Sequence, residues 1–139
     1  TSKFTSKVSL GIADYPMCRL AEAYLIEAEC LLKGSQPDVV KGLQILNALR
    51  VKRGESQLTS AQFTSDEIWK ERRRELYGEG FALSDIKRLQ KPLERVGEEH
   101  WSDVISLPAN SPRMMFPIPA DELDYNKSAT SDDQNEYWR

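Results

Sequence analysis

Hydrophobic and polar positions follow a helical period along the first part of the chain. Apolar residues recur at steps of three and four from Pro16 until Gly34, and this spacing predicts an amphipathic helix that starts near Pro16. After a short turn, a second run of the same period begins at Asp38 and ends at Gly54. Residues 16–53 are therefore predicted to form a hairpin of two antiparallel helices.

Two further helices are predicted over residues 64–91. The third helix begins with a capping box, in which the Thr64 hydroxyl and the Glu67 carboxylate each accept the other residue's backbone N–H. It continues to about Tyr77 or the glycine after it, because the apolar period continues that far. A shorter fourth helix closes before Pro92, which cannot continue it.

The helical period fades in residues 92–139, which hold five of the seven prolines. The run Pro117-Ile118-Pro119 excludes a regular helix at that point, and only a short one is expected at Ala120 to Leu123. Residues 1–15 are predicted to be an extended lead-in. The expected fold class is mainly α: a tetratricopeptide-like helix pair and further helices, wrapped by an irregular, proline-rich C-terminal segment.

Composition places these elements in a globular chain. The 139 residues are 40% hydrophobic and 29% charged, with seven glycines and seven prolines, so collagen-like and wholly disordered classes are excluded. No apolar run reaches the roughly 18 residues that a membrane-spanning helix needs. The formal net charge of -3 is too small to define a partner, since it neither attracts nor repels polyanions strongly.

The predicted hairpin has the size of one tetratricopeptide-type unit, and a single unit of this kind cannot bury its own hydrophobic face. No second matching repeat occurs in the chain, so we expect the neighbouring unit to precede Thr1 in a longer protein. The first residue is also not methionine, which is typical of a fragment or a processed product. The chain alone is then expected to expose apolar surface along Leu20 to Leu32.

Arg72 is a charged residue at a position where the helical period predicts an apolar one. Ile68, Arg72 and Leu76 are four residues apart, which places the guanidinium on the apolar stripe of the third helix. A buried cation needs a carboxylate partner, so we expect a structural ion-pair network. Two functional alternatives stay open: an anion-binding arginine, and a pair of acids for glycoside hydrolysis. The expected network consists of Glu71, Arg72, Glu75, Glu79 and Asp85.

No motif for nucleotide binding, nucleophilic hydrolysis or zinc catalysis occurs, so no catalytic residue, cofactor or metal ligand is predicted. Cys18 and Cys30 would lie about 18 Å apart along a continuous helix, beyond the reach of a disulfide, and are interpreted as small buried hydrophobic residues. A dyad of Cys18 with His100 lacks an identifiable orienting residue. Residues 66–79 hold four basic and five acidic residues, which disfavours a nucleic-acid partner.

Aromatic residues in the C-terminal segment give a weaker signal. Aromatic rings stack on the apolar C–H faces of sugars, but they also pin irregular segments to a core, and this second interpretation is favoured here. Trp101 is the weak candidate for carbohydrate contact because it stands in a polar stretch. The aromatic residues concerned are Trp101, Tyr125, Tyr137 and Trp138.

Six blocks of sequence follow one another in a specific order and spacing. They are RLAEAYLIEAE at 19–29, LNALRVKRG at 46–54, ERRRELYGEG at 71–80, DIKR at 85–88, FPIPADE at 116–122 and QNEY at 134–137. Together they resemble the C-terminal part of the SusD/RagB family, over nearly the whole chain.

This resemblance implies a mainly helical fold with tetratricopeptide-type helix pairs. It also implies a surface-exposed outer-membrane lipoprotein of Bacteroidetes that binds glycans without catalysis and passes them to a TonB-dependent, SusC-like transporter. The lipid anchor would lie outside this chain, and no binding residue is carried over. The alternative to sugar binding is a helical-repeat scaffold that grips a protein.

Overall fold

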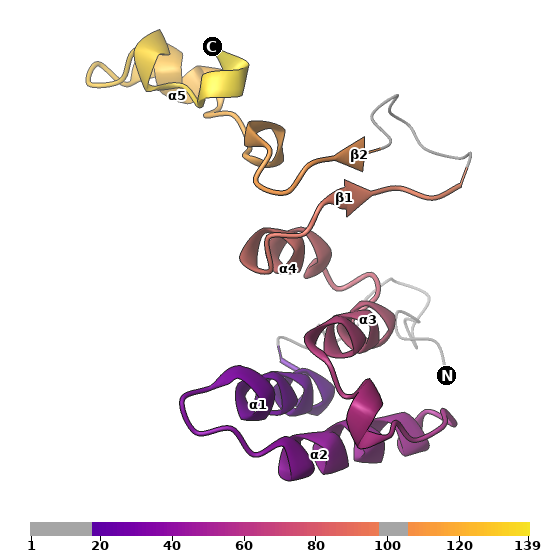
Figure 1. Ribbon diagram of the computed structural model, residues 1–139. Coiled ribbons are helices and arrows are strands. Elements are labelled where there is room, and N and C mark those ends of the chain that lie inside the picture. Colours follow the sequence, from indigo (N-terminus) through magenta and orange to yellow (C-terminus); the bar gives the residue numbers. More distant parts are fainter. Residues whose placement is uncertain (1–17, 98–105) are drawn as a thin grey trace, which may run out of the picture. The chain divides into compact units, whose positions relative to one another are not determined.

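The computed structural model describes residues 18–97 and 106–139 (Figure 1). The chain divides into two compact units, Thr1–Tyr77 and Gly78–Arg139, and each is considered by itself. Most of the regular structure is helical, which confirms the mainly α fold class. The predicted lead-in over residues 1–15 lies outside the described residues.

The first unit is built from three α-helices and one short 3-10 turn among its described residues. Helix α1 is joined to α2 by a tight turn, and the two pack against each other as the predicted hairpin (Figure 1). Helix α3 packs against α1. The elements are α1 (Leu20–Lys33), α2 (Val39–Lys52), η1 (Ser60–Gln62) and α3 (Ser65–Glu75).

Helix α1 begins at Leu20, so the predicted start near Pro16 is wrong. Arg19 has extended backbone angles, with φ at -115° and ψ at 144°, and is the residue that precedes the helix. Its side chain donates hydrogen bonds to Glu75 of α3, and this tertiary contact fixes Arg19 outside the helix. A period of apolar residues carries no information about such a contact.

The boundaries of α2 agree with the sequence. The Asp38 side chain caps its first turn by accepting a hydrogen bond of 3.0 Å from the Lys41 backbone N–H. Beyond the last turn, Gly54 has a φ of 79°, a left-handed conformation that glycine adopts without steric cost. Both ends of this helix are therefore specified locally.

Only half of the predicted capping box forms at α3. The Thr64 hydroxyl accepts a hydrogen bond of 3.2 Å from the Glu67 backbone N–H. The Glu67 carboxylate accepts instead from the Lys70 ammonium group, at 3.0 Å, because that cation lies one turn further along the same helix. Helix α3 ends at Glu75, slightly before the predicted Tyr77.

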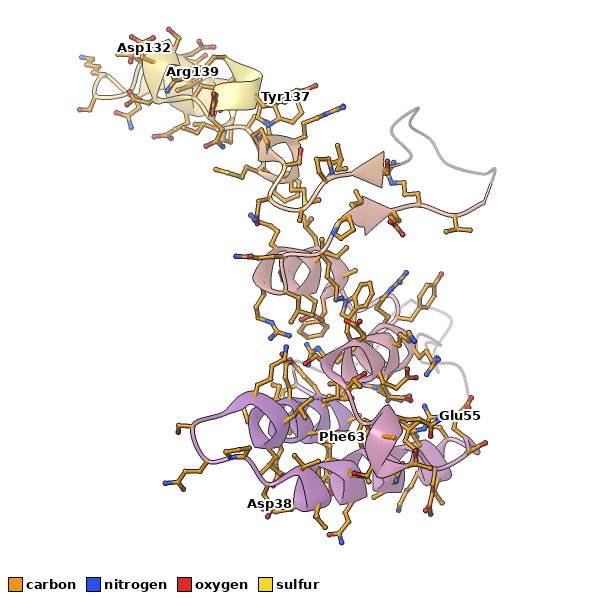
Figure 2. The ribbon with its side chains drawn as sticks, in the orientation of Figure 1. Asp38, Glu55, Phe63, Asp132, Tyr137 and Arg139 are labelled. Carbon is orange, nitrogen blue, oxygen red and sulfur yellow. The ribbon has the colours of Figure 1, made fainter. Side chains whose placement is uncertain are left out.

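Each helix contributes one large, fully buried side chain to the core of the first unit: Leu25, Leu46 and Ile68 are 0–1% exposed. Phe63, which follows η1, closes the core beside α2 (Figure 2). A Cβ atom added to Gly42 of α2 would lie 2.9 Å from the Phe63 ring, so a larger residue at this position would force the ring to shift.

Both cysteines are exposed and free, which corrects the interpretation that they are buried. Cys18 precedes α1. Cys30 falls beside the stripe of α1 that faces the core, where Leu25 and Ala28 are buried. An apolar side chain at a helical position thus need not belong to the buried face.

The described residues of the second unit form two short helices and several single turns. Its strands are two residues long and antiparallel, with Leu93 opposite Leu107. This ribbon was not predicted, because two residues are too few to show an alternating pattern. The elements are α4 (Ala82–Arg88), β1 (Leu93–Glu94), β2 (Ser106–Leu107), η2 (Pro112–Met114), α5 (Ala120–Tyr125), η3 (Ser131–Asp133) and η4 (Glu136–Trp138).

Hydrogen bonds between side chains and the backbone hold the C-terminal part of the second unit together. Gln134 accepts a hydrogen bond of 2.8 Å from the Ile118 N–H and donates one of 3.0 Å to the Ile118 carbonyl. The Trp138 indole N–H donates to the Met115 carbonyl at 2.8 Å. The segment is irregular, as predicted, and α5 covers the expected short helix. That this segment wraps the helices stays a prediction, as does the division into residues 16–53, 64–91 and 92–139.

Candidate functional site

A network of carboxylates and guanidinium groups joins α2 to α3. Arg53 donates two hydrogen bonds of 2.7 Å, one to each carboxylate oxygen of Glu75, which is the two-pronged geometry of a strong ion pair. Arg19 donates to the same carboxylate and to the Glu75 backbone carbonyl. Glu75 therefore connects α3 with the end of α2 and with the residue before α1.

One turn earlier, Glu71 serves a second pair of cations. Arg50 of α2 and Arg74 of α3 both donate to its Oε2 atom, Arg74 at 3.0 Å. Arg50 also donates from its Nε atom to the Ser56 carbonyl at 2.8 Å. In the second unit, Asp85 accepts from Arg88 at 3.1 Å.

Arg72 itself is 5% exposed, in keeping with its place on the apolar stripe of α3. Its pairing, and that of Glu79, stay predictions. Sequence reasoning missed Arg19, Arg50 and Arg53 as the cations that reach Glu71 and Glu75. A signal existed, since two arginines three residues apart on one helix complement two acids four residues apart on another.

The Arg53 guanidinium holds the pKa of Glu75 below its usual value of 4.5, with help from Arg19 and against the opposing effect of burial. The same contact raises the pKa of Arg53. A general acid of a glycosidase needs a raised pKa and a proton to give. The arrangement favours a structural role for Glu75 over the hydrolytic alternative.

An apolar groove of about 480 Å³ runs between α1 and α2. Its walls include Leu20 and Tyr24 from α1, which are 67% and 39% exposed. Ile45 and Ala48 line it from α2. The expectation of exposed apolar surface along the first helix is thereby confirmed for the chain by itself.

The outer face of α3 carries a second, shallower hollow of about 570 Å³, and this face is basic and aromatic. It is lined by Lys70, Arg73 and Arg74, which are neighbours on α3, and by Tyr77, which lies just beyond the end of the helix. The Arg73 guanidinium lies 4.9 Å from the centroid of the Trp69 ring, a cation–π contact. We call these four lining residues the α3 basic face.

The aromatic residues of the C-terminal segment have separate environments. Tyr137, labelled in Figure 2, meets Trp138 edge to face with ring centroids 5.0 Å apart. The Arg113 guanidinium lies 5.0 Å from the Tyr137 centroid. These contacts tie the last turns of the chain to η2, within one unit. Tyr125 is 81% exposed. Trp101, the weak carbohydrate candidate, lies outside the described residues.

Within residues 18–97 and 106–139, no group of three or more His, Cys, Asp or Glu side chains is placed to hold a metal ion. No helix in these ranges is long and apolar enough to cross a membrane.

The described residues thus define a mainly helical protein with an apolar groove between α1 and α2 and a basic face on α3. The model of the SusD family matches residues 2–138. The chain belongs to the SusD family.

Two solved structures show the same fold. A SusD superfamily protein from Bacteroides vulgatus is 34% identical, with a TM-score of 0.70 over 85% of this chain and 26% of that one. A SusD superfamily protein from Bacteroides thetaiotaomicron is also 34% identical, with a TM-score of 0.72 over 85% of this chain and 27% of that one. The chain thus spans about a quarter of the length of these relatives. Comparison with curated proteins finds no match.

Proposed function

We propose that the protein to which this chain belongs binds oligosaccharides or related nutrients at the cell surface, without catalysis, and delivers them to a TonB-dependent transporter. The observation that carries this proposal is the SusD family match over residues 2–138. Two solved SusD superfamily structures at 34% identity support it. Because the chain spans about a quarter of those proteins, the activity is proposed for the whole protein.

The proposed location is the outer membrane, with a lipid anchor elsewhere in the whole protein. The supporting observation is the source of the two solved relatives, both from Bacteroides species. Nucleic acid is not part of the proposal, since the acids of α3 offset its cations.

The non-catalytic part of the proposal has support from side-chain geometry. Glu71 and Glu75 are the buried acids of α3, and Oε2 of Glu71 and both carboxylate oxygens of Glu75 accept hydrogen bonds from guanidinium groups. Neither is arranged as a proton donor. Replacing Glu75 with Gln is expected to lower stability, whereas a hydrolytic role predicts a loss of turnover.

An array of plant and host oligosaccharides, probed with the whole protein, tests the proposal. The expected result is saturable binding to at least one glycan, which chromatography then recovers unchanged. Absence of binding to every glycan, or recovery of a shortened glycan, would overturn it. A SusD-family protein that binds a different glycan is the matched control for the quality of the array.

The apolar groove between α1 and α2 favours a second candidate function, the protein-binding scaffold. In the whole protein, Ala48→Glu places a charge in the groove, and Val40→Glu places the same charge at a position of α2 outside it. The scaffold predicts that only Ala48→Glu releases the co-purifying transporter, with glycan binding unchanged. Equal effects of the two substitutions would reject this candidate.

A further inference from the structure

We propose that the α3 basic face binds the carboxylate or sulfate group of an acidic saccharide, with Arg73 holding the anion and Tyr77 stacking on the sugar ring. This inference rests on the proposed function and names its ligand class. Three of its residues, Lys70, Arg73 and Arg74, belong to α3, and Tyr77 lies just beyond the end of this helix in the same unit.

The spacing of the four residues creates one continuous surface. Lys70, Arg73, Arg74 and Tyr77 lie three or four residues apart and line the same hollow of about 570 Å³. The Tyr77 side chain is 78% exposed, so its ring is open to the apolar C–H face of a sugar. The hollow is open and shallow, which suits one or two sugar units.

Charge distinguishes Arg73 from its neighbours on this face. Lys70 is paired with Glu67 at 3.0 Å, and Arg74 with Glu71 at 3.0 Å. In the described part of the chain no carboxylate forms a salt bridge with Arg73. Its guanidinium stacks on the Trp69 ring instead, and this contact restricts the side chain without neutralising its charge.

A guanidinium held in this way is suited to a planar or tetrahedral oxyanion. It presents parallel N–H groups that bind two oxygens of a carboxylate or sulfate at once. Lys70 and Arg74 lie beside it, each with its own carboxylate partner. Tyr77, one turn away, then lies where the ring that carries the anion would rest.

The balance of charge favours a saccharide over a nucleic acid. Residues 66–79 carry four basic and five acidic residues, and two of the three cations on the face already have acidic partners. A phosphate backbone needs several uncompensated cations in a row. A single uncompensated guanidinium beside an exposed ring matches one acidic sugar unit.

Calorimetric titration of the whole protein tests the inference with three probes: trigalacturonate, the same trisaccharide with its carboxylates reduced to alcohols, and a sulfated trisaccharide. The expected result is at least tenfold tighter binding of one or both acidic probes than of the neutral one, with affinity that falls as salt is raised. Comparison of the carboxylated and sulfated probes shows which of the two anionic groups the site binds.

Variants locate the site. Arg73→Gln is expected to weaken acidic binding at least tenfold and to leave neutral binding unchanged, while Arg73→Lys gives an intermediate loss because it keeps the charge. Arg113→Gln is the matched control, since Arg113 also stacks on an aromatic ring, Tyr137, in the other unit. Circular dichroism melting confirms that each variant is folded.

The outcomes are distinct. Equal affinity for acidic and neutral probes, or equal effects of Arg73→Gln and Arg113→Gln, overturns the inference and leaves the proposed function standing if neutral glycans bind. Competition by a short oligonucleotide at the same concentration as the acidic sugar also overturns it. Absence of binding to any glycan removes the proposed function, and the inference with it.

Discussion

Among the described residues, the first unit buries more apolar side chains than the second. Leu25, Leu46 and Ile68 come from three helices and are 0–1% exposed, and charged pairs tie the same helices together. In the second unit, Met114 is 5% exposed, and the amide side chain of Gln134 is nearly as well buried at 8%. The first unit is organised by apolar contacts between helices, and the C-terminal part of the second by hydrogen bonds from side chains to the backbone.

This difference predicts how the stability of each unit responds to the loss of one side chain. Removing one large side chain from a helical core lowers the stability of the whole unit, because all of its helices contact that side chain. A segment held by individual hydrogen bonds loosens locally when one bond is lost. The following substitutions test this contrast, in order of decreasing expected effect.

Leu25→Ala is expected to lower the free energy of unfolding of the first unit by about 3 to 4 kcal/mol, because it leaves a cavity where three helices meet. Ile26→Ala is the matched control on the same helix, since Ile26 is 48% exposed, and should cost under about 1 kcal/mol. Urea unfolding followed by circular dichroism measures both. Similar losses for the two variants would contradict the assigned core.

Glu75→Gln is expected to cost about 2 kcal/mol. The substitution leaves Arg53 and Arg19 without their charged partner, but Arg53 is half exposed and is partly compensated by water, so the loss falls below that for a fully buried pair. Glu136→Gln, at an exposed position of the second unit, is the control. If both variants unfold at the same urea concentration, the ion pair contributes nothing measurable.

Acid should weaken the first unit through Glu75. Its pKa is below the usual 4.5 in the folded protein, so the unfolded chain binds more protons in the acidic range. The stabilising contribution is fully present above pH 4.5 and is lost as the pH falls through the folded-state pKa. The difference in unfolding free energy between the natural chain and Glu75→Gln should therefore shrink below pH 4.5. A difference that grows on acidification would mean the sign is wrong.

Gln134→Ala is expected to cost about 1 to 2 kcal/mol, since it removes the bonds to both Ile118 backbone groups. Amide hydrogen exchange should speed up around residues 116–119 and 134–138 and stay unchanged in α1 to α3. Lys127→Ala, at an exposed site of the same unit, should alter neither region. Faster exchange throughout α1 to α3 would show that the contrast between the units is wrong.

Trp138→Phe has the smallest expected effect, below about 1 kcal/mol. It keeps an aromatic ring beside Tyr137 but removes the N–H donor to the Met115 carbonyl. Faster exchange near the end of the chain, measured against the natural sequence, is the expected sign. A larger loss than that of Gln134→Ala would reverse the assigned order of these bonds.

The sequence predicted the helices well because their signals are local. Asp38 and Gly54 mark the ends of α2, and the apolar stripe of α3 locates Ile68 and Arg72 on its buried side. The start of α1 was missed because Arg19 is held by Glu75, which is 56 residues away. A contact between residues so far apart in the chain produces no periodic pattern in a single sequence.

The candidate site was predicted less well for the same reason. The acids Glu71 and Glu75 were found on the helix that carries them, but their partners on α2 depend on how the helices pack. The α3 basic face was not predicted, because the sequence argument used only the net charge of residues 66–79. A net charge does not show which cations already have acidic partners. Trp101 lies outside the described residues.

The most direct test of the central claim is a titration in which binding and turnover are measured on the same sample. The whole protein is titrated calorimetrically with the best glycan from the array, and the recovered glycan is then sized by chromatography. Saturable heat with a glycan of unchanged length is the predicted result. No heat with any glycan, or a glycan cut to shorter products, would contradict the account.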